Sequence, residues 1–111
     1  MTIIQITKTN FDQILAQQDL MVVSFSADWC KPCQTFKKVL EQISADCPEV
    51  TVAIIDIEKE KELGEEFKVT SVPATMILRQ RTLVFAETGI LSVPALKGLI
   101  SRARKILSDA D

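Results

Sequence analysis

The sequence predicts an α/β protein in which a mixed central β-sheet carries helices on both faces. Apolar runs of strand length alternate with segments of helical periodicity, in the order βαβαβαββα, and this alternation requires parallel crossovers. Only a short turn separates the last two strands, so that pair is antiparallel. Because the chain has 111 residues, we expect residues 1–111 to form a single domain.

The first half of the chain predicts two strands and two helices. Residues 3–6 form a short apolar strand, and a helix follows with Asn10 as its N-cap. Residues 20–27 are almost unbroken apolar, which is typical of a strand covered on both faces. Apolar residues at three- and four-residue spacing then predict a helix over residues 31–46.

The second half predicts three strands and two helices. Residues 49–57 read as a buried strand, and the charged residues 58–67 as a helix with a solvated face. Residues 74–80 and 82–88 form the antiparallel pair. Ser92 caps the last helix, whose core-facing stripe is Leu96, Leu99, Ile100, Ala103, Ile106 and Leu107.

Composition argues against several classes of protein. The net charge is −2 and Lys and Arg are interspersed with Asp and Glu, so no basic face predicts a nucleic-acid partner. The N-terminal residues do not resemble an export signal, and no apolar run reaches the roughly 18 residues of a membrane span. We therefore expect a soluble cytoplasmic monomer with no membrane partner. Three cysteines are too few for a disulfide scaffold.

The stretch WCKPC, residues 29–33, lies where the second predicted strand ends and the second helix begins. Backbone N–H groups and the helix dipole at this junction stabilise a thiolate at Cys30, and the ammonium of Lys31 adds to this. Cys33 follows one helical turn later, within reach of a disulfide. Pro32 suits a first helical turn because its missing N–H needs no partner there. The spacing predicts a redox pair with Cys30 activated and Cys33 shielded.

WCKPC and the later SVPAT, residues 71–75, together resemble the thioredoxin family. The resemblance covers essentially the whole chain, because the order of elements matches too. It implies a thioredoxin-like fold and a dithiol–disulfide oxidoreductase that reduces protein disulfides with no bound cofactor beyond the Cys30–Cys33 disulfide. It also implies a separate reductase as electron donor, such as a flavoenzyme that uses NADPH.

The resemblance also implies roles for individual residues. Cys30 resembles the attacking thiol and Cys33 the resolving thiol. Pro73 resembles the family's cis-proline, which would place the backbone of Val72 beside the cysteines to pair with an extended substrate segment. The other substrate-binding positions are Trp29, Lys31, Pro32 and Gly89. Two alternatives stay open: Pro73 as a trans residue that opens a strand, and Trp29 as a packed aromatic.

The chain departs from the family pattern at two buried positions. Ser24 stands where the family commonly has an acid, and Ile54 where a lysine often lies. Joint replacement leaves no unpaired buried charge, so we expect the fold to survive. The proton of Cys33 must then go to water or to a less buried carboxylate, Asp28 or Asp56. We expect release of the mixed disulfide to be slower than in typical members of the family below the usual thiol pKa of about 8.5.

Three further residues differ from the pattern or stand outside it. Lys31 replaces a usual glycine and adds a charge that bears on the redox potential, the targets and the recycling enzyme. Arg81 replaces a turn glycine, so we expect a different type of turn. Cys47 is interpreted as a small apolar filler or a surface thiol, with a regulatory or dimer-forming thiol as the alternative.

Three other functions stay open. A structural zinc site needs about four ligands, whereas Cys30 and Cys33 supply two and the chain has no His. A thioredoxin-like scaffold with idle cysteines would tolerate Ser24 and Ile54. A disulfide oxidase or isomerase would use the same pair in the other direction, but the apparent lack of an export signal favours the reductase.

Overall fold

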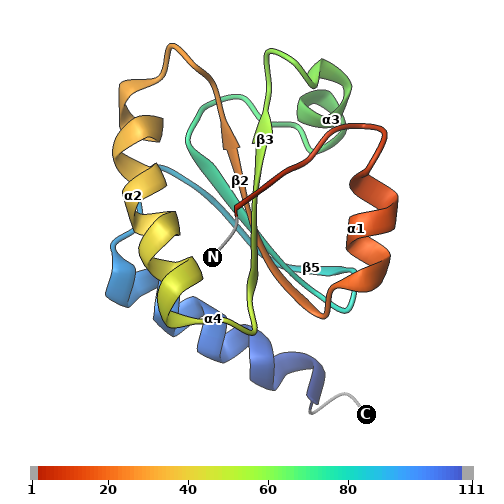
Figure 1. Ribbon diagram of the computed structural model, residues 1–111, viewed down its shortest axis with the longest axis vertical. Coiled ribbons are helices and arrows are strands. Elements are labelled where there is room, and N and C mark those ends of the chain that lie inside the picture. Colours follow the sequence, from red (N-terminus) through yellow and green to blue (C-terminus); the bar gives the residue numbers. More distant parts are fainter. Residues whose placement is uncertain (1–2, 109–111) are drawn as a thin grey trace.

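The computed structural model describes residues 3–108, and their side chains as far as residue 105. Within this range a five-stranded sheet has the order β1-β3-β2-β4-β5 (Figure 1). The strands are β1 (Ile4–Gln5), β2 (Leu20–Ser26), β3 (Thr51–Asp56), β4 (Ala74–Arg79) and β5 (Thr82–Thr88). The helices are α1 (Phe11–Gln17), α2 (Lys31–Asp46), α3 (Lys61–Glu66) and α4 (Val93–Ser108). β1, β3 and β2 run parallel to one another, whereas β4 is antiparallel to both of its neighbours, β2 and β5. The predicted mixed sheet and element order are therefore confirmed.

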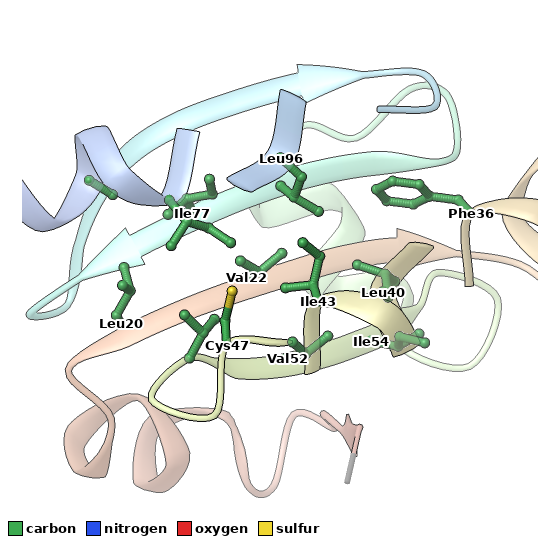
Figure 2. Packing of buried hydrophobic residues seen from close by; sticks show 13 residues of the cluster. Leu20, Val22, Phe36, Leu40, Ile43, Cys47, Val52, Ile54, Ile77 and Leu96 are labelled. Atoms are coloured by element: carbon green, nitrogen blue, oxygen red, sulfur yellow. The ribbon is translucent and has the colours of Figure 1, made fainter. Parts of the chain in front are cut away.

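The helices cover both faces of the sheet, with α2 and α4 on one side and α1 and α3 on the other (Figure 1). Alternate residues of β2 divide between two apolar clusters, which explains its unbroken apolar sequence. Leu20 and Val22 join the cluster under α2 and α4 (Figure 2), whereas Met21, Val23 and Phe25 join the opposite one.

The start of α3 and the capping of α1 differ from the predictions because side chains bind nearby backbone groups. α3 begins at Lys61 rather than at residue 58, since Oδ1 of Asp56 accepts hydrogen bonds from the N–H groups of Glu58 and Lys59 and holds a turn there. Asn10 is the N-cap residue of α1 as predicted, but its side chain accepts from the Thr7 N–H at 2.8 Å and makes no hydrogen bond to the helix. The strands predicted over residues 3–6 and 49–57 are also longer than the observed β1 and β3.

The C-terminal half agrees more closely with the predicted elements. Ser92 caps α4 as predicted, because its Oγ accepts from the Ala95 N–H at 3.2 Å. The predicted stripe residues Leu96, Ile100 and Ala103 are buried, and the side chains of Ile106 and Leu107 lie outside the described residues.

The turn between β4 and β5 differs from the prediction. Gln80 and Arg81 have φ values of 50° and 69°, so the two-residue turn keeps the left-handed backbone of a tight hairpin. Arg81 therefore adopts the conformation that glycine favours, rather than changing the type of turn to avoid it.

Candidate active site

Cys30 and Cys33 form a disulfide at the start of α2, with a Cα–Cα distance of 5.2 Å. Cys30 is the N-cap of the helix, and the N–H of Cys33 donates to its Sγ at 3.1 Å. Pro32 lies in the first turn, where an N–H would have no partner within the helix. In the reduced protein this helix start offers an N–H donor to a thiolate at Cys30.

Both cysteines are buried, Cys30 at 3% exposure and Cys33 at 5%, in a small cluster with Ala27, Ile57 and Val72. Cys33 is buried, as predicted for the shielded thiol, but Cys30 is buried to the same extent, so burial does not distinguish the two. Cys33 also lines a cavity of about 340 Å³. The two sulfurs differ in their hydrogen bonding, because Sγ of Cys30 accepts a hydrogen bond from the backbone N–H of Cys33.

The second motif lies against the first. The Val72–Pro73 peptide bond is cis, so the alternative of a trans proline is wrong. The carbonyl oxygen of Val72 lies 3.8 Å from Sγ of Cys30. Gly89 has a φ of 95°, which favours glycine, and its N–H donates to the Pro73 carbonyl at 2.8 Å. The structure thus brings five of the predicted site residues together, namely Cys30, Cys33, Val72, Pro73 and Gly89.

The other predicted site residues lie on the surface. Trp29 is 66% exposed, so it is not a packed aromatic, and Lys31 and Pro32 are exposed on the first turn of α2. Ile90 follows Gly89 and is 49% exposed, and it was not among the predicted site residues. The feature of the sequence that could have indicated Ile90 is its position, since it is an apolar residue between the last strand and the N-cap of α4. Among the described residues, the large apolar side chains exposed to solvent are Trp29, Leu83 and Ile90.

The two substituted positions of the family pattern are neighbours. Ser24 and Ile54 face each other across β2 and β3, and both are buried. Both line the cavity that reaches Cys33. The carboxylates of Asp28 and Asp56, which we predicted as proton acceptors, line it as well.

Cys47 lies at the other end of α2 and is free. Its side chain is buried in the apolar cluster under α2 and α4 (Figure 2), as predicted for an apolar filler and not for a surface thiol. Among the described residues, no group of three or more His, Cys, Asp and Glu side chains could hold a metal ion. No helix in that part of the chain has the length and apolar character needed to cross a membrane.

Comparisons with known proteins agree with this geometry. The Thioredoxin family model matches residues 2–102. A thioredoxin-named protein of Streptomyces coelicolor is 36% identical over 106 residues, 96% of this chain and 79% of that protein. The thioredoxin of Chlamydia pneumoniae is 31% identical over 97 residues, 87% of this chain and 94% of that protein. A mutant thioredoxin from Halobacterium salinarum has a TM-score of 0.85 at 28% identity, covering 93% of this chain and 91% of that one. The chain therefore belongs to the thioredoxin family and is a dithiol–disulfide oxidoreductase.

Proposed function

We propose that this protein reduces disulfides of other proteins, with Cys30 as the attacking thiol and Cys33 as the resolving thiol. The observation that supports these roles is the Cys33 N–H, 3.1 Å from Sγ of Cys30 at the N-terminus of α2. This donor and the helix dipole stabilise a thiolate at Cys30. In the described part of the chain, the sulfur of Cys33 has no such donor.

The reaction takes place in two exchange steps. The Cys30 thiolate attacks one sulfur of the target disulfide, a mixed disulfide forms, and the other target sulfur leaves as a thiolate. Cys33 then loses its proton and attacks Sγ of Cys30, so the bond between Cys30 and the target breaks. Two electrons pass from the pair to the target, and the two released sulfurs take up protons.

The target binds on the surface around the disulfide. The residues assigned to this contact are Trp29, Lys31, Pro32, Val72, Pro73 and Gly89, to which we add Ile90. An extended segment of the target pairs with the backbone of Val72, which lies beside Cys30. Apolar side chains next to the target disulfide contact Trp29 and Ile90, because both are exposed.

The wider setting follows from this role. Residues 1–111 act as a single domain and a monomer, with no cofactor beyond the disulfide. The electrons come from a separate reductase, a flavoenzyme that uses NADPH. The protein acts in the cytoplasm, where the glutathione and thioredoxin systems keep thiols reduced.

Reduction of insulin, with dithiothreitol as the electron source, tests the proposal. The parent protein is expected to accelerate the reaction, and Cys30→Ser to lose about a thousandfold or more of this acceleration, as for loss of a catalytic nucleophile. Cys33→Ser is expected to trap a mixed disulfide at Cys30, detected by mass mapping. Cys47→Ser is the matched control and should keep the parent rate. An active Cys30→Ser variant would refute the roles, and a pair that mainly oxidises dithiols would favour the oxidase or isomerase.

A further inference from the structure

The two edges of the sheet differ in how well they are protected. One edge is β1, which is two residues long, and the other is β5, which is seven residues long. In the described part of the chain, no strand pairs with the outer side of β5. Its sequence TLVFAET contains no Pro or Lys, the residues that commonly protect an edge, and Glu87 is its one charged residue. β5 is therefore a free edge to which another extended segment can be added.

The backbone groups of β5 that face outward follow from the hydrogen bonding at its end. The N–H of Gly89 donates to the Pro73 carbonyl at 2.8 Å, which marks a hydrogen-bonded pair. Such pairs alternate with non-hydrogen-bonded pairs in an antiparallel ladder, and the register is regular from residue 88 back to Phe85. Ala86 and Thr88 therefore direct their N–H and C=O groups away from β4. The irregularity of the ladder lies beyond Phe85, so it does not protect this stretch.

An apolar groove lies on one face of the sheet beside the same stretch. It has a volume of about 350 Å³. Side chains of β5 and of the segment that follows α3 line it, among them Leu83, Ala86, Phe67 and Val69. Leu83 is 49% exposed. Because side chains of a strand alternate between the two faces of a sheet, a segment paired with β5 would place every second side chain beside this groove.

The free edge begins next to the active site. Gly89 directly follows β5, and its N–H binds the Pro73 carbonyl. Val72 precedes Pro73, and its carbonyl oxygen lies 3.8 Å from Sγ of Cys30. A strand added at β5 lies about two strand spacings, roughly 10 Å, from β4, and about three extended residues span this distance. A target bound at Cys30 can therefore reach the edge of β5 with residues close to its own cysteine.

A second copy of this chain fits the edge less well than such a target. If two β5 strands pair antiparallel and use the outward groups of Ala86 and Thr88 in both copies, Glu87 lies opposite Glu87. Like charges directly opposite each other destabilise a pair of strands, whereas opposite charges stabilise it. The edge is therefore suited to a segment with a basic residue at this position.

We propose that the outer edge of β5 binds an extended segment of the target protein, about three residues from the target cysteine, in which apolar residues alternate with basic ones. The segment adds a sixth strand to the five-stranded sheet. Its backbone binds the outward groups of Ala86 and Thr88, its apolar side chains cover the groove, and a basic side chain lies opposite Glu87. Binding there raises the concentration of the target disulfide near Cys30. The inference rests on the proposed function, because it takes protein disulfides as the substrates.

Three mixed disulfides with thionitrobenzoate, a leaving group that is coloured when released, test the proposal. The first contains a peptide in which three residues separate the cysteine from a segment of alternating valine and lysine, placed on either side of the cysteine in two versions. The second is the same peptide with every backbone nitrogen of the segment methylated, and the third contains N-acetylcysteine alone. Attack by Cys30 of the reduced protein releases the colour.

The parent protein should distinguish the two peptides. At low concentration, we expect at least one version of the unmethylated peptide to react about tenfold faster than its methylated form, because methylation removes the hydrogen bonds to β5. The difference should lie in the peptide concentration that gives half the maximal rate. The maximal rate itself should be the same for both, since the segment does not touch the reacting sulfurs.

A proline in β5 should remove this preference. Ala86→Pro deletes one outward N–H and spares the ladder with β4, since an edge strand tolerates Pro where its nitrogen faces solvent. The variant should react equally with both peptides and keep the parent rate with the N-acetylcysteine disulfide. Ala86→Ser keeps the N–H and should retain the preference. Circular dichroism and thermal unfolding check the fold.

Hydrogen exchange gives a second measurement that does not need the proline variant to fold. Cys33→Ser traps the peptide on Cys30, and the amides of Ala86 and Thr88 should exchange more slowly with the unmethylated peptide than with the methylated one.

The outcomes separate this inference from the proposed function. Equal rates for the two peptides with the parent protein overturn the inference and leave the proposed function standing, because all three disulfides are still attacked. A preference that persists in folded Ala86→Pro overturns it as well. Dimers of the parent protein that Ala86→Pro dissociates would assign the edge to a second copy and overturn it too. A parent protein that releases colour from none of the three disulfides overturns the proposed function instead.

Discussion

The two ends of α2 each carry a cysteine, and the two have different surroundings. Cys30 is the N-cap and Cys47 the C-cap, and both are buried. The sulfur of Cys30 accepts the Cys33 N–H, whereas Cys47 uses its own N–H to donate to the Ile43 carbonyl at 2.8 Å. Exposure therefore does not distinguish the reactive cysteine. The end of the helix does, since its N-terminus presents N–H donors to a sulfur and its C-terminus presents carbonyl oxygens.

Both ends of α2 also carry charges that oppose the helix dipole. The basic Lys31 lies in the first turn, and the acidic Asp46 in the last. At the C-terminal end, Lys97 of α4 offsets this by binding Asp46 at 2.8 Å. At the N-terminal end, Lys31 directly follows Cys30, the residue that we propose as the attacking thiol. We therefore expect the N-terminal charge to favour a thiolate at Cys30 at the expense of the helix.

Alkylation of the reduced protein should show the largest difference between the two ends. Near neutral pH we expect iodoacetamide to modify Cys30 on the order of a hundredfold faster than Cys47, because the thiolate is the reactive form and Cys47 is packed among apolar side chains. Lower pH should slow the reaction at Cys30. Peptide mass mapping measures both rates, and in concentrated urea the difference should disappear. Equal rates in the folded protein would contradict the role assigned to the helix ends.

How far the sequence predicts the fold depends on the range of the interactions that determine each element. Both ends of α2 agree with the predicted residues 31–46, since Pro32 and the apolar spacing are strong local signals. The start of α3 was wrong because the side chain of Asp56 competes for two backbone N–H groups. Such competition between side chain and backbone is not visible in apolar spacing.

The features of the site can likewise be separated into those that short motifs reveal and those that depend on contacts between distant segments. Cys30, Cys33 and Pro73 lie in short motifs, so their neighbourhood could be predicted from the resemblance. The cavity beside Cys33 could not, because the place of Ser24 and Ile54 in it depends on the register between strands distant in sequence, where a shift of one residue turns every side chain to the other face. The equal burial of Cys30 and Cys33 depends on a cavity formed by several elements, which no local pattern reveals.

Reversing the charge at Lys31 should affect reactivity and stability in opposite directions. Lys31→Glu places a carboxylate beside Cys30, so we expect alkylation of Cys30 near neutral pH to slow by about three- to tenfold. A negative charge in the first turn interacts favourably with the helix dipole, so the free energy of unfolding should rise by a few tenths of a kcal/mol. Lys31→Met is the matched neutral control and should give intermediate values of both. If the two quantities fall together, the charge does not favour the thiolate at the expense of the helix.

The ion pair at the C-terminal end of α2 should give the smallest effect, because both groups are exposed to solvent. The hydrogen bond from Lys97, with a second from Gln42, holds the pKa of Asp46 below its usual value. A carboxyl group with a lowered pKa in the folded state adds stability above its unfolded pKa, and this stability is lost as the pH falls. Lys97→Gln should therefore lower the Tm slightly at neutral pH, and the difference from the parent should begin to shrink near pH 4 and vanish once the pH is below the lowered pKa of Asp46.

Thermal unfolding of both proteins across this pH range measures the difference, with Lys105→Gln on the same helix as the control. The alkylation rate of Cys30 should stay at the parent value, since Lys97 binds the opposite end of α2 from the reactive pair. A Tm difference that persists at low pH would mean that Lys97 stabilises the protein through packing of its methylene groups, because protonated Asp46 offers no charge to pair with.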